Sequence, residues 1–137
     1  MDFSSINWLA VIVATLASFA LGALWYSVLF KNTWNKEVGI PEEKMKDANL
    51  AKIFGTCLLL TAVMATGMAI LIQGHGKGMI DWYGGAWHGV FIGVCFVAPT
   101  IGINYLYQRK SLKLFLVDAG YQVAFLKIMG IILGAWQ

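Results

Sequence analysis

Four apolar stretches, each long enough to cross a lipid bilayer, constrain the fold of this chain more than any other feature of its sequence. They cover residues 7–30, 53–72, 83–107 and 114–136. A transmembrane helix needs about 20 mainly apolar residues, and backbone groups in lipid must be satisfied within the helix itself. The sequence therefore predicts an all-α polytopic membrane protein, in which residues 1–137 form one domain of four transmembrane helices.

The composition agrees with a membrane location. Hydrophobic residues make up 59% of the chain and charged residues 12%, whereas about 25% of an ordinary soluble domain is charged. A soluble domain of 137 residues has too small an interior to bury so many apolar side chains. Cys57 and Cys95 lie in apolar runs without a CxxC or Cys/His spacing. We interpret both as small buried hydrophobes and expect no metal and no cofactor.

The lysines and arginines predict the orientation of the chain. Five lysines lie in the connection 31–52, and Arg109, Lys110 and Lys113 follow the third stretch, whereas the connection after the second stretch holds only Lys77. Because basic connections stay in the cytoplasm, both termini are expected outside, in the inner (plasma) membrane of a bacterium. The first stretch is too long for the core of a signal peptide, and its head, MDFSSI, carries no basic residue, so we expect it to be retained.

The connection 31–52 is expected to contain a short cytoplasmic helix that leads into the second transmembrane helix. In its segment GIPEEKMKDANLAK, Pro41 suits a first helical turn, and Glu42 and Glu43 follow where the helix dipole favours acids. The mixed charges are typical of a solvated surface element. Lipid sensing or the docking of a partner protein is the alternative interpretation.

Small residues at four-residue spacing predict the faces along which the helices pack, because association in lipid depends on close approach of the backbones. The stripes occur in the first, third and fourth stretches, and their members are Ala10, Ala14, Ser18 and Gly22, then Gly85, Gly89 and Gly93, and finally Gly120, Gly130 and Gly134. The pattern predicts a tight bundle. It leaves open which contacts lie within one chain and which lie between copies. Four short helices have little interior, so we expect a homo-oligomer.

The fourth stretch carries two ionisable residues, Asp118 and Lys127. Their spacing of nine positions places them on opposite faces of a helix, about 13 Å apart along its axis. Lys127 shares its face with Gly120, Gly130 and Gly134, so we expect it to point into the protein near the midplane. An uncompensated charge there costs at least about 2.5–3.5 kcal/mol. The lysine either handles a solute or proton, or is satisfied by hydroxyls and carbonyls, or reaches outward to the interface.

Other polar residues lie within the spans and could be partners of Asp118 and Lys127 or part of a polar path. Asp118 shares its face with Gln122, and Asn104 lies at a similar depth in the third stretch, so a clamp between Asp118 and Asn104 or Arg109 is the structural interpretation of the carboxylate. His88 is interpreted as a hydrogen-bonded packing residue, with a ligand or proton relay as the alternative. The candidate polar path therefore consists of Lys127, His88, Asn104, Asp118, Gln122 and Ser18.

Motifs of known catalytic or nucleic-acid-binding proteins do not occur. The sequence holds no HExxH, no GxSxG, no paired carboxylates within a span and no Rossmann fingerprint. The glycine-rich connection QGHGKGMIDWYGG lacks the GK[ST] ending of a P-loop. The basic residues are accounted for by membrane orientation. The sequence therefore favours a protein that is not an enzyme and that binds no nucleic acid.

Three segments resemble a known family. Residues 7–11 read NWLAV, residues 21–27 read LGALWYS and residues 114–121 read LFLVDAGY. The chain is similar there to small bacterial membrane proteins catalogued only as a domain of unknown function, and it departs from their pattern at Val28, where a proline is expected. The matching positions are Asn7, Trp8, Gly22, Trp25, Tyr26, Ser27, Asn104, Ala119, Gly120 and Tyr121. The resemblance implies the four-helix architecture and leaves the activity open.

Three functional hypotheses follow from these observations. The leading one is a homo-oligomeric carrier, channel or sensor for a small solute or ion, in which the polar path within the spans is used. The second is a structural or accessory membrane subunit that docks a partner through the connection 31–52. The third is a lipid-modifying membrane enzyme with His88 as its base.

Overall fold

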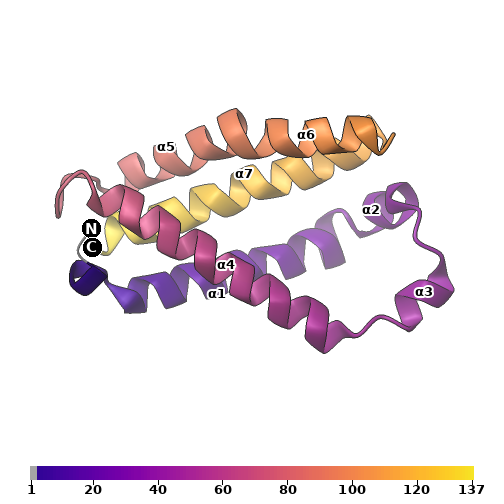
Figure 1. Ribbon diagram of the computed structural model, residues 1–137, viewed down its shortest axis with the longest axis horizontal. Helices are drawn as coiled ribbons and strands as arrows, with labels where there is room; N and C mark the ends of the chain where they lie inside the picture. Colours follow the sequence, from indigo (N-terminus) through magenta and orange to yellow (C-terminus); the bar gives the residue numbers. More distant parts are fainter. Residues whose placement is uncertain (1–2) are drawn as a thin grey trace.

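The computed structural model describes residues 3–137, and these fold into a helical bundle. Within them, the helices long and apolar enough to cross a membrane are Trp8–Leu29, Leu50–Gln73, Trp82–Tyr107 and Leu112–Ala135. The expectation of an all-α membrane protein with four spans is thus confirmed. Because four spans bring the chain back to its starting side, both ends of the described residues 3–137 lie at one end of the bundle (Figure 1). We call this the terminal end, and we call the opposite end, which carries residues 31–49 and 108–111, the basic end.

Two of the four spans are interrupted by π-helical turns. The first span consists of α1 (Trp8–Leu24) and the π turn Trp25–Leu29. The third consists of α5 (Trp82–Ile92), the π turn Gly93–Val97 and α6 (Ala98–Tyr107). Pro99 lies at the start of α6 and has no N–H to donate, which accounts for an interruption at this position. Single π turns inside α-helices are frequent at functional sites.

The other two spans are uninterrupted, and each begins at a polar capping residue. Asn49 accepts a hydrogen bond from the Lys52 N–H at the start of α4 (Leu50–Gln73). Ser111 accepts one from the Leu114 N–H at the start of α7 (Leu112–Ala135). These caps satisfy N–H groups that have no partner within the helix, and they set where each span begins.

The connection between the first two spans holds two short helices, where the sequence predicted one. They are α2 (Lys31–Val38) and α3 (Glu42–Lys46). Gly39 ends α2 with a left-handed φ of 67°, a conformation that glycine adopts without strain. The expected short helix is present as α3, with Glu42 and Glu43 in its first turn, but it ends before residues 47–49 and so does not run into α4 as expected. Neither short helix has a buried residue.

The closest helix pair is α5 with α7, which lie side by side along one edge of the bundle (Figure 1). A Cβ atom added to Gly85 would overlap the Gly130 carbonyl oxygen and lie 2.8 Å from its carbon. Gly89 faces the backbone of residues 126 and 127 in the same way, and Gly134 faces the backbone of Asp81. The glycines therefore let the two backbones touch, as helix association in lipid favours.

The second packing surface joins α1 to α7 and α4. Ala10, Ala14 and Ser18 are each exposed by 1% or less, so the small-residue stripe of α1 lies inside the bundle. Larger side chains from α4 and α7, such as Met68 and Met129, fill the space around it. The core is thus concentrated in the terminal half of the bundle.

The basic half of the bundle is more open. Residues 50–60 of α4 are all exposed, and in Figure 1 this part of α4 diverges from α7 toward α3. Cys57 and Cys95 are likewise exposed, so their interpretation as buried side chains is wrong. In a membrane these exposed apolar residues contact lipid or another protein chain.

Candidate functional site

The Asp118 carboxylate links three of the four spans. Its Oδ1 accepts a hydrogen bond from the Tyr26 hydroxyl at 2.6 Å, and its Oδ2 accepts one from the Tyr105 hydroxyl at 2.5 Å. Asp118 lies on α7, Tyr26 in the π turn of the first span and Tyr105 on α6. Distances of this size are typical of hydroxyl groups that donate to an ionised carboxylate. The cluster therefore holds a half-buried acid between donors from two other helices.

The π turn of the first span places two consecutive aromatic residues against α7. Beside Tyr26, Trp25 donates its Nε1–H to the Val117 carbonyl oxygen at 3.1 Å. A π turn closes an i→i+5 hydrogen bond, seen here between the Phe30 N–H and the Trp25 oxygen at 2.8 Å. The turn thus inserts one residue into the helix and alters the directions of the side chains that follow. Trp25 and Tyr26 stand three and four positions after Gly22, which itself faces Tyr121, so helical spacing places both rings on the face of the first span that meets α7.

Aromatic rings pack around Tyr26, which donates to the carboxylate from the first span. Tyr26 packs edge-on against Trp34 at 5.6 Å and Tyr121 at 5.1 Å between ring centroids. Gly22 provides the room for Tyr121, because a Cβ there would lie 2.8 Å from its hydroxyl oxygen. Apolar surroundings of this kind strengthen the hydrogen bonds of the carboxylate and raise the cost of leaving any of its partners unpaired.

Within residues 3–137, two buried polar atoms without partners lie on α7 and α1, on the terminal side of the acidic cluster. Gln122 follows Asp118 by one turn of α7, and Ser18 precedes Gly22 by one turn of α1. Among the described residues, neither the Gln122 Oε1 nor the Ser18 Oγ has a hydrogen-bond partner, although both atoms are buried. A buried polar group left unsatisfied costs about 1–3 kcal/mol. These atoms are therefore unused acceptors next to the acidic cluster.

Lys127 does not point into the single chain, and the expectation that it does is wrong. Its side chain is exposed on α7, in the membrane-spanning part of the bundle. The helix α5 does cover the predicted small-residue face of α7. It contacts the backbone of Leu126 and Gly130, and at Lys127 it contacts only the backbone nitrogen. The lysine side chain consequently lies at the margin of this contact and turns outward.

The other predicted polar residues also lie apart from Asp118. Asn104 is exposed, and its neighbour Tyr105 takes the place at the carboxylate, so the predicted clamp with Asn104 or Arg109 is wrong. His88 lies on α5, its ring centroid is 5.0 Å from that of His75, and its Nδ1 is 2.7 Å from the Gly84 oxygen. Of the other candidate residues, Gln122 lies one turn from Asp118 on α7, and Ser18 is buried on α1, two turns before Tyr26.

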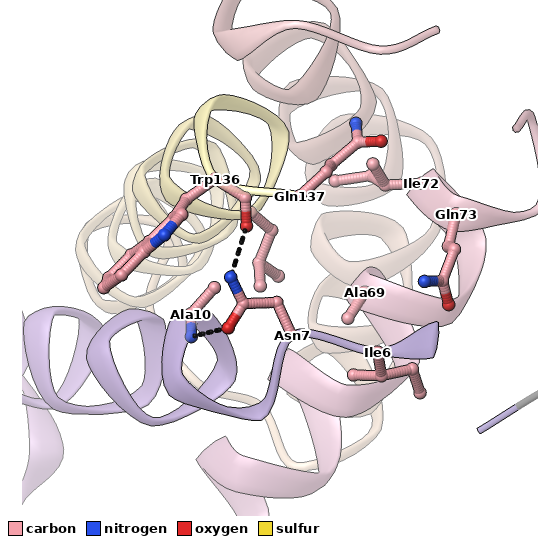
Figure 2. A pocket seen from close by; sticks show the side chains of 9 residues that line it. Ile6, Asn7, Ala10, Ala69, Ile72, Gln73, Trp136 and Gln137 are labelled. Carbon is pink, nitrogen blue, oxygen red and sulfur yellow. Dashed lines mark hydrogen bonds between the residues drawn. The ribbon is translucent and has the colours of Figure 1, made fainter. Parts of the chain in front are cut away.

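A small pocket lies at the terminal end, where the two ends of the described chain meet (Figure 2). Asn7 accepts a hydrogen bond from the Ala10 N–H at 3.1 Å and donates one to the Trp136 oxygen at 3.3 Å. Gln73 and Gln137 line the pocket beside apolar side chains. About 20 Å³ is open to the centres of water molecules, which is room for one or two waters. Asn7 therefore joins the first and last helices and does not line a site for a larger solute.

The fold and the acidic cluster define a small polytopic membrane protein with a carboxylate held between its spans. The chain belongs to the family described as "Protein of unknown function (DUF1761)", whose model matches residues 9–134. This match confirms the resemblance inferred from the sequence. No curated protein and no solved structure matches the chain.

Proposed function

We propose that the protein is a homo-oligomeric carrier for a small solute or ion in the inner membrane of a bacterium, and that Asp118 is the group that binds or senses the cargo. The observation that carries this proposal is the attachment of one carboxylate to hydroxyls from two other spans. Because these hydrogen bonds hold three spans together, the relative positions of the spans depend on whether the carboxylate is charged and on whether it has bound a proton or cation. A ligand shifts a conformational equilibrium only when it interacts differently with the two states.

The chemistry of the cluster provides this difference. A proton or cation that binds to Asp118 neutralises the charge to which Tyr26 and Tyr105 donate, and charge-assisted hydrogen bonds are about twice as strong as neutral ones. Loss of that strength loosens the contacts between α7 and the two spans that contain π turns. We propose that these turns absorb the resulting movement, because they are already departures from regular α-helix.

The unpaired acceptors extend the site into the membrane. Gln122 Oε1 and Ser18 Oγ lie on the terminal side of Asp118 and are buried without partners among the described residues. A hydrated cation or a polar solute would satisfy them, which supports a polar path of Asp118, Gln122 and Ser18. Lys127, His88 and Asn104 are not part of this revised path.

Self-association is supported by the exposed side chain of Lys127. A charged group facing lipid at mid-span costs at least about 2.5–3.5 kcal/mol, and a second copy packed on this face of α7 would offer it backbone carbonyls and hydroxyls. The exposed residues 50–60 of α4 provide a further uncovered surface. The proposal keeps the orientation inferred from the basic residues, with the basic end in the cytoplasm and both termini outside.

Flux through reconstituted protein tests the proposal. Wild type, Asp118→Asn and Asp81→Asn would be compared in liposomes for transport of protons, monovalent cations and small metabolites. Asp81 is the matched control, because it caps α5 at the terminal end and asparagine caps helices equally well. Flux in wild type and Asp81→Asn that is lost in a folded Asp118→Asn variant is the expected result. Equal flux in all three, or background flux in all three, would overturn the proposal.

One observation favours a second candidate, an accessory subunit that docks a partner protein at the basic end. Helices α2 and α3 have no buried residue, and Ile40, in the short link between them, is an exposed apolar side chain. Crosslinking from Lys36 and Lys44 in native membranes would capture the partner. Products that contain only lipid and further copies of this chain would discredit the docking function.

A further inference from the structure

The two histidines of the chain meet at the terminal end, away from Asp118. His75 follows the end of α4 and His88 lies on the second turn of α5, with 5.0 Å between their ring centroids and 76° between their planes. His75 is exposed and His88 is half-buried. The pair is thus accessible from the aqueous side and has one wall formed by the bundle.

The hydrogen bonds of both rings fix the same tautomer. His75 Nδ1 is 3.0 Å from the Leu71 oxygen, and His88 Nδ1 is 2.7 Å from the Gly84 oxygen. A carbonyl oxygen only accepts, so each Nδ1 carries the proton and each neutral ring leaves its Nε2 lone pair free. Metal-binding histidines characteristically donate their second N–H to a backbone carbonyl in this way.

The separation of the rings suits a shared metal ion. A transition metal lies about 2.0–2.1 Å from each coordinating nitrogen, so two imidazoles at a tetrahedral angle place their centroids about 5.2 Å apart. The observed 5.0 Å fits this arrangement, and it also lies in the range of a direct edge-to-face contact between two rings, so metal titration decides between the two. Among the described residues 3–137 no third His, Cys, Asp or Glu completes a group with the pair, so the remaining positions would fall to water.

The loop that carries His75 is held in place by hydrogen bonds. The Gly76 N–H donates to the Gln73 oxygen at 2.9 Å, and the Gly78 N–H donates to the Gln137 side chain at 2.7 Å. The side-chain amide of Gln137 also donates to the Ile80 oxygen. The two imidazoles are therefore already positioned before a ligand arrives, which reduces the entropy lost on binding.

We propose that His75 and His88 together bind one divalent transition-metal ion at the terminal end. Two neutral imidazoles suit Zn²⁺, Cu²⁺ or Ni²⁺ and do not suit Mg²⁺ or Ca²⁺, which prefer oxygen ligands. Water in the remaining positions makes the site open and exchangeable, unlike a closed structural zinc site with four protein ligands. The site goes beyond the proposed function, because it does not involve Asp118.

Zn²⁺ titration of tag-free protein in detergent tests the site. The variants are His75→Gln, His88→Gln and, as a control in the same loop, Lys77→Gln, and thermal melts show that each is folded. We expect one Zn²⁺ per wild-type chain, no competition from equimolar Mg²⁺, and affinity weakened at least about tenfold in either histidine variant, because the second contact is then no longer intramolecular. Lys77→Gln should bind no more weakly than wild type.

Imidazole NMR provides an independent readout, because the chain has only two histidines. Zn²⁺ should shift the Nε2 resonances of both rings together, and binding should weaken as the pH falls because the ligand nitrogens must be unprotonated. The proposal is overturned if Zn²⁺ affinity is unchanged in both histidine variants. It is equally overturned if only one histidine affects binding or only one resonance shifts, since the ion would then not be shared.

Discussion

Replacement of Gly85 by alanine should separate α5 from α7. The added Cβ would overlap the Gly130 oxygen and lie 3.2 Å from the Gly134 Cα, and both contacts are with backbone. No side chain can rotate away, so the helices must move apart by on the order of 1 Å, which forfeits a quarter to a half of the dispersion energy along the interface. Overpacking typically costs 1–3 kcal/mol, and contact with backbone places this variant at the upper end, about 3 kcal/mol.

Gly67→Ala is the matched control, because nothing lies within 4 Å of a Cβ at this position of α4. Alanine there raises helix propensity by about 1 kcal/mol and should leave stability unchanged or increased. The free energy of unfolding of both variants would be measured in mixed micelles with increasing dodecyl sulfate, followed by circular dichroism. If Gly85→Ala unfolds within about 0.5 kcal/mol of Gly67→Ala, the backbone contact between α5 and α7 does not exist as described.

Two further perturbations address the polar groups. Tyr26→Phe and Tyr105→Phe should each lower the free energy of unfolding by about 0.6–1.7 kcal/mol, the range of hydrogen bonds measured inside membranes. The loss of unfolding free energy in each tyrosine variant should be smaller when Asp118 has already been replaced by asparagine. If the effects of the tyrosine and Asp118 substitutions simply add in the same micelle assay, the hydrogen bonds of the cluster are not formed. Lys127→Met keeps the aliphatic stem and removes the charge, and under the homo-oligomer proposal it should weaken self-association in bilayers measured by energy transfer on lipid dilution. Unchanged or stronger association would show that the amine makes no contact between copies.

The spans could be predicted from the sequence because a long apolar segment in the hydrocarbon of a membrane must form a helix, the structure that satisfies its backbone groups internally. The boundaries were less predictable, because they depend on local caps. The second span begins at Leu50, three residues before the predicted start at 53, since Asn49 caps it. The connection 31–52 splits into two helices at Gly39, whose left-handed conformation the charge pattern did not indicate.

The partners of the polar residues could not be predicted from helical spacing. Helical spacing assigned Lys127 to the same face of α7 as Gly130. A neighbouring helix covers only part of such a face, and the position of α5 decides which side chains of the face are buried. Depth along the span pointed to Asn104 as the partner of Asp118, and the actual donor is the adjacent Tyr105. Tyr26 follows Gly22 by one turn and so continues the four-residue spacing of the first span, but this spacing did not indicate that its hydroxyl donates to Asp118.

The segments that carry the family resemblance help to separate packing from function in the acidic cluster. LGALWYS and LFLVDAGY lie about ninety residues apart, and they meet through Trp25 on the Val117 oxygen, Tyr26 on Asp118 and Gly22 beneath Tyr121. Packing alone would be served by apolar side chains, since replacing buried polar pairs with hydrophobic residues is often neutral or stabilising. Asp118 is the only acid in this contact and imposes a desolvation cost that a purely architectural contact does not require. The test therefore combines Asp118→Leu with Tyr26→Phe and Tyr105→Phe, so that no hydroxyl is left without its acceptor. A folded triple variant that is at least as stable as wild type but inactive in flux would favour the carrier, whereas a large loss of stability would favour a structural clamp.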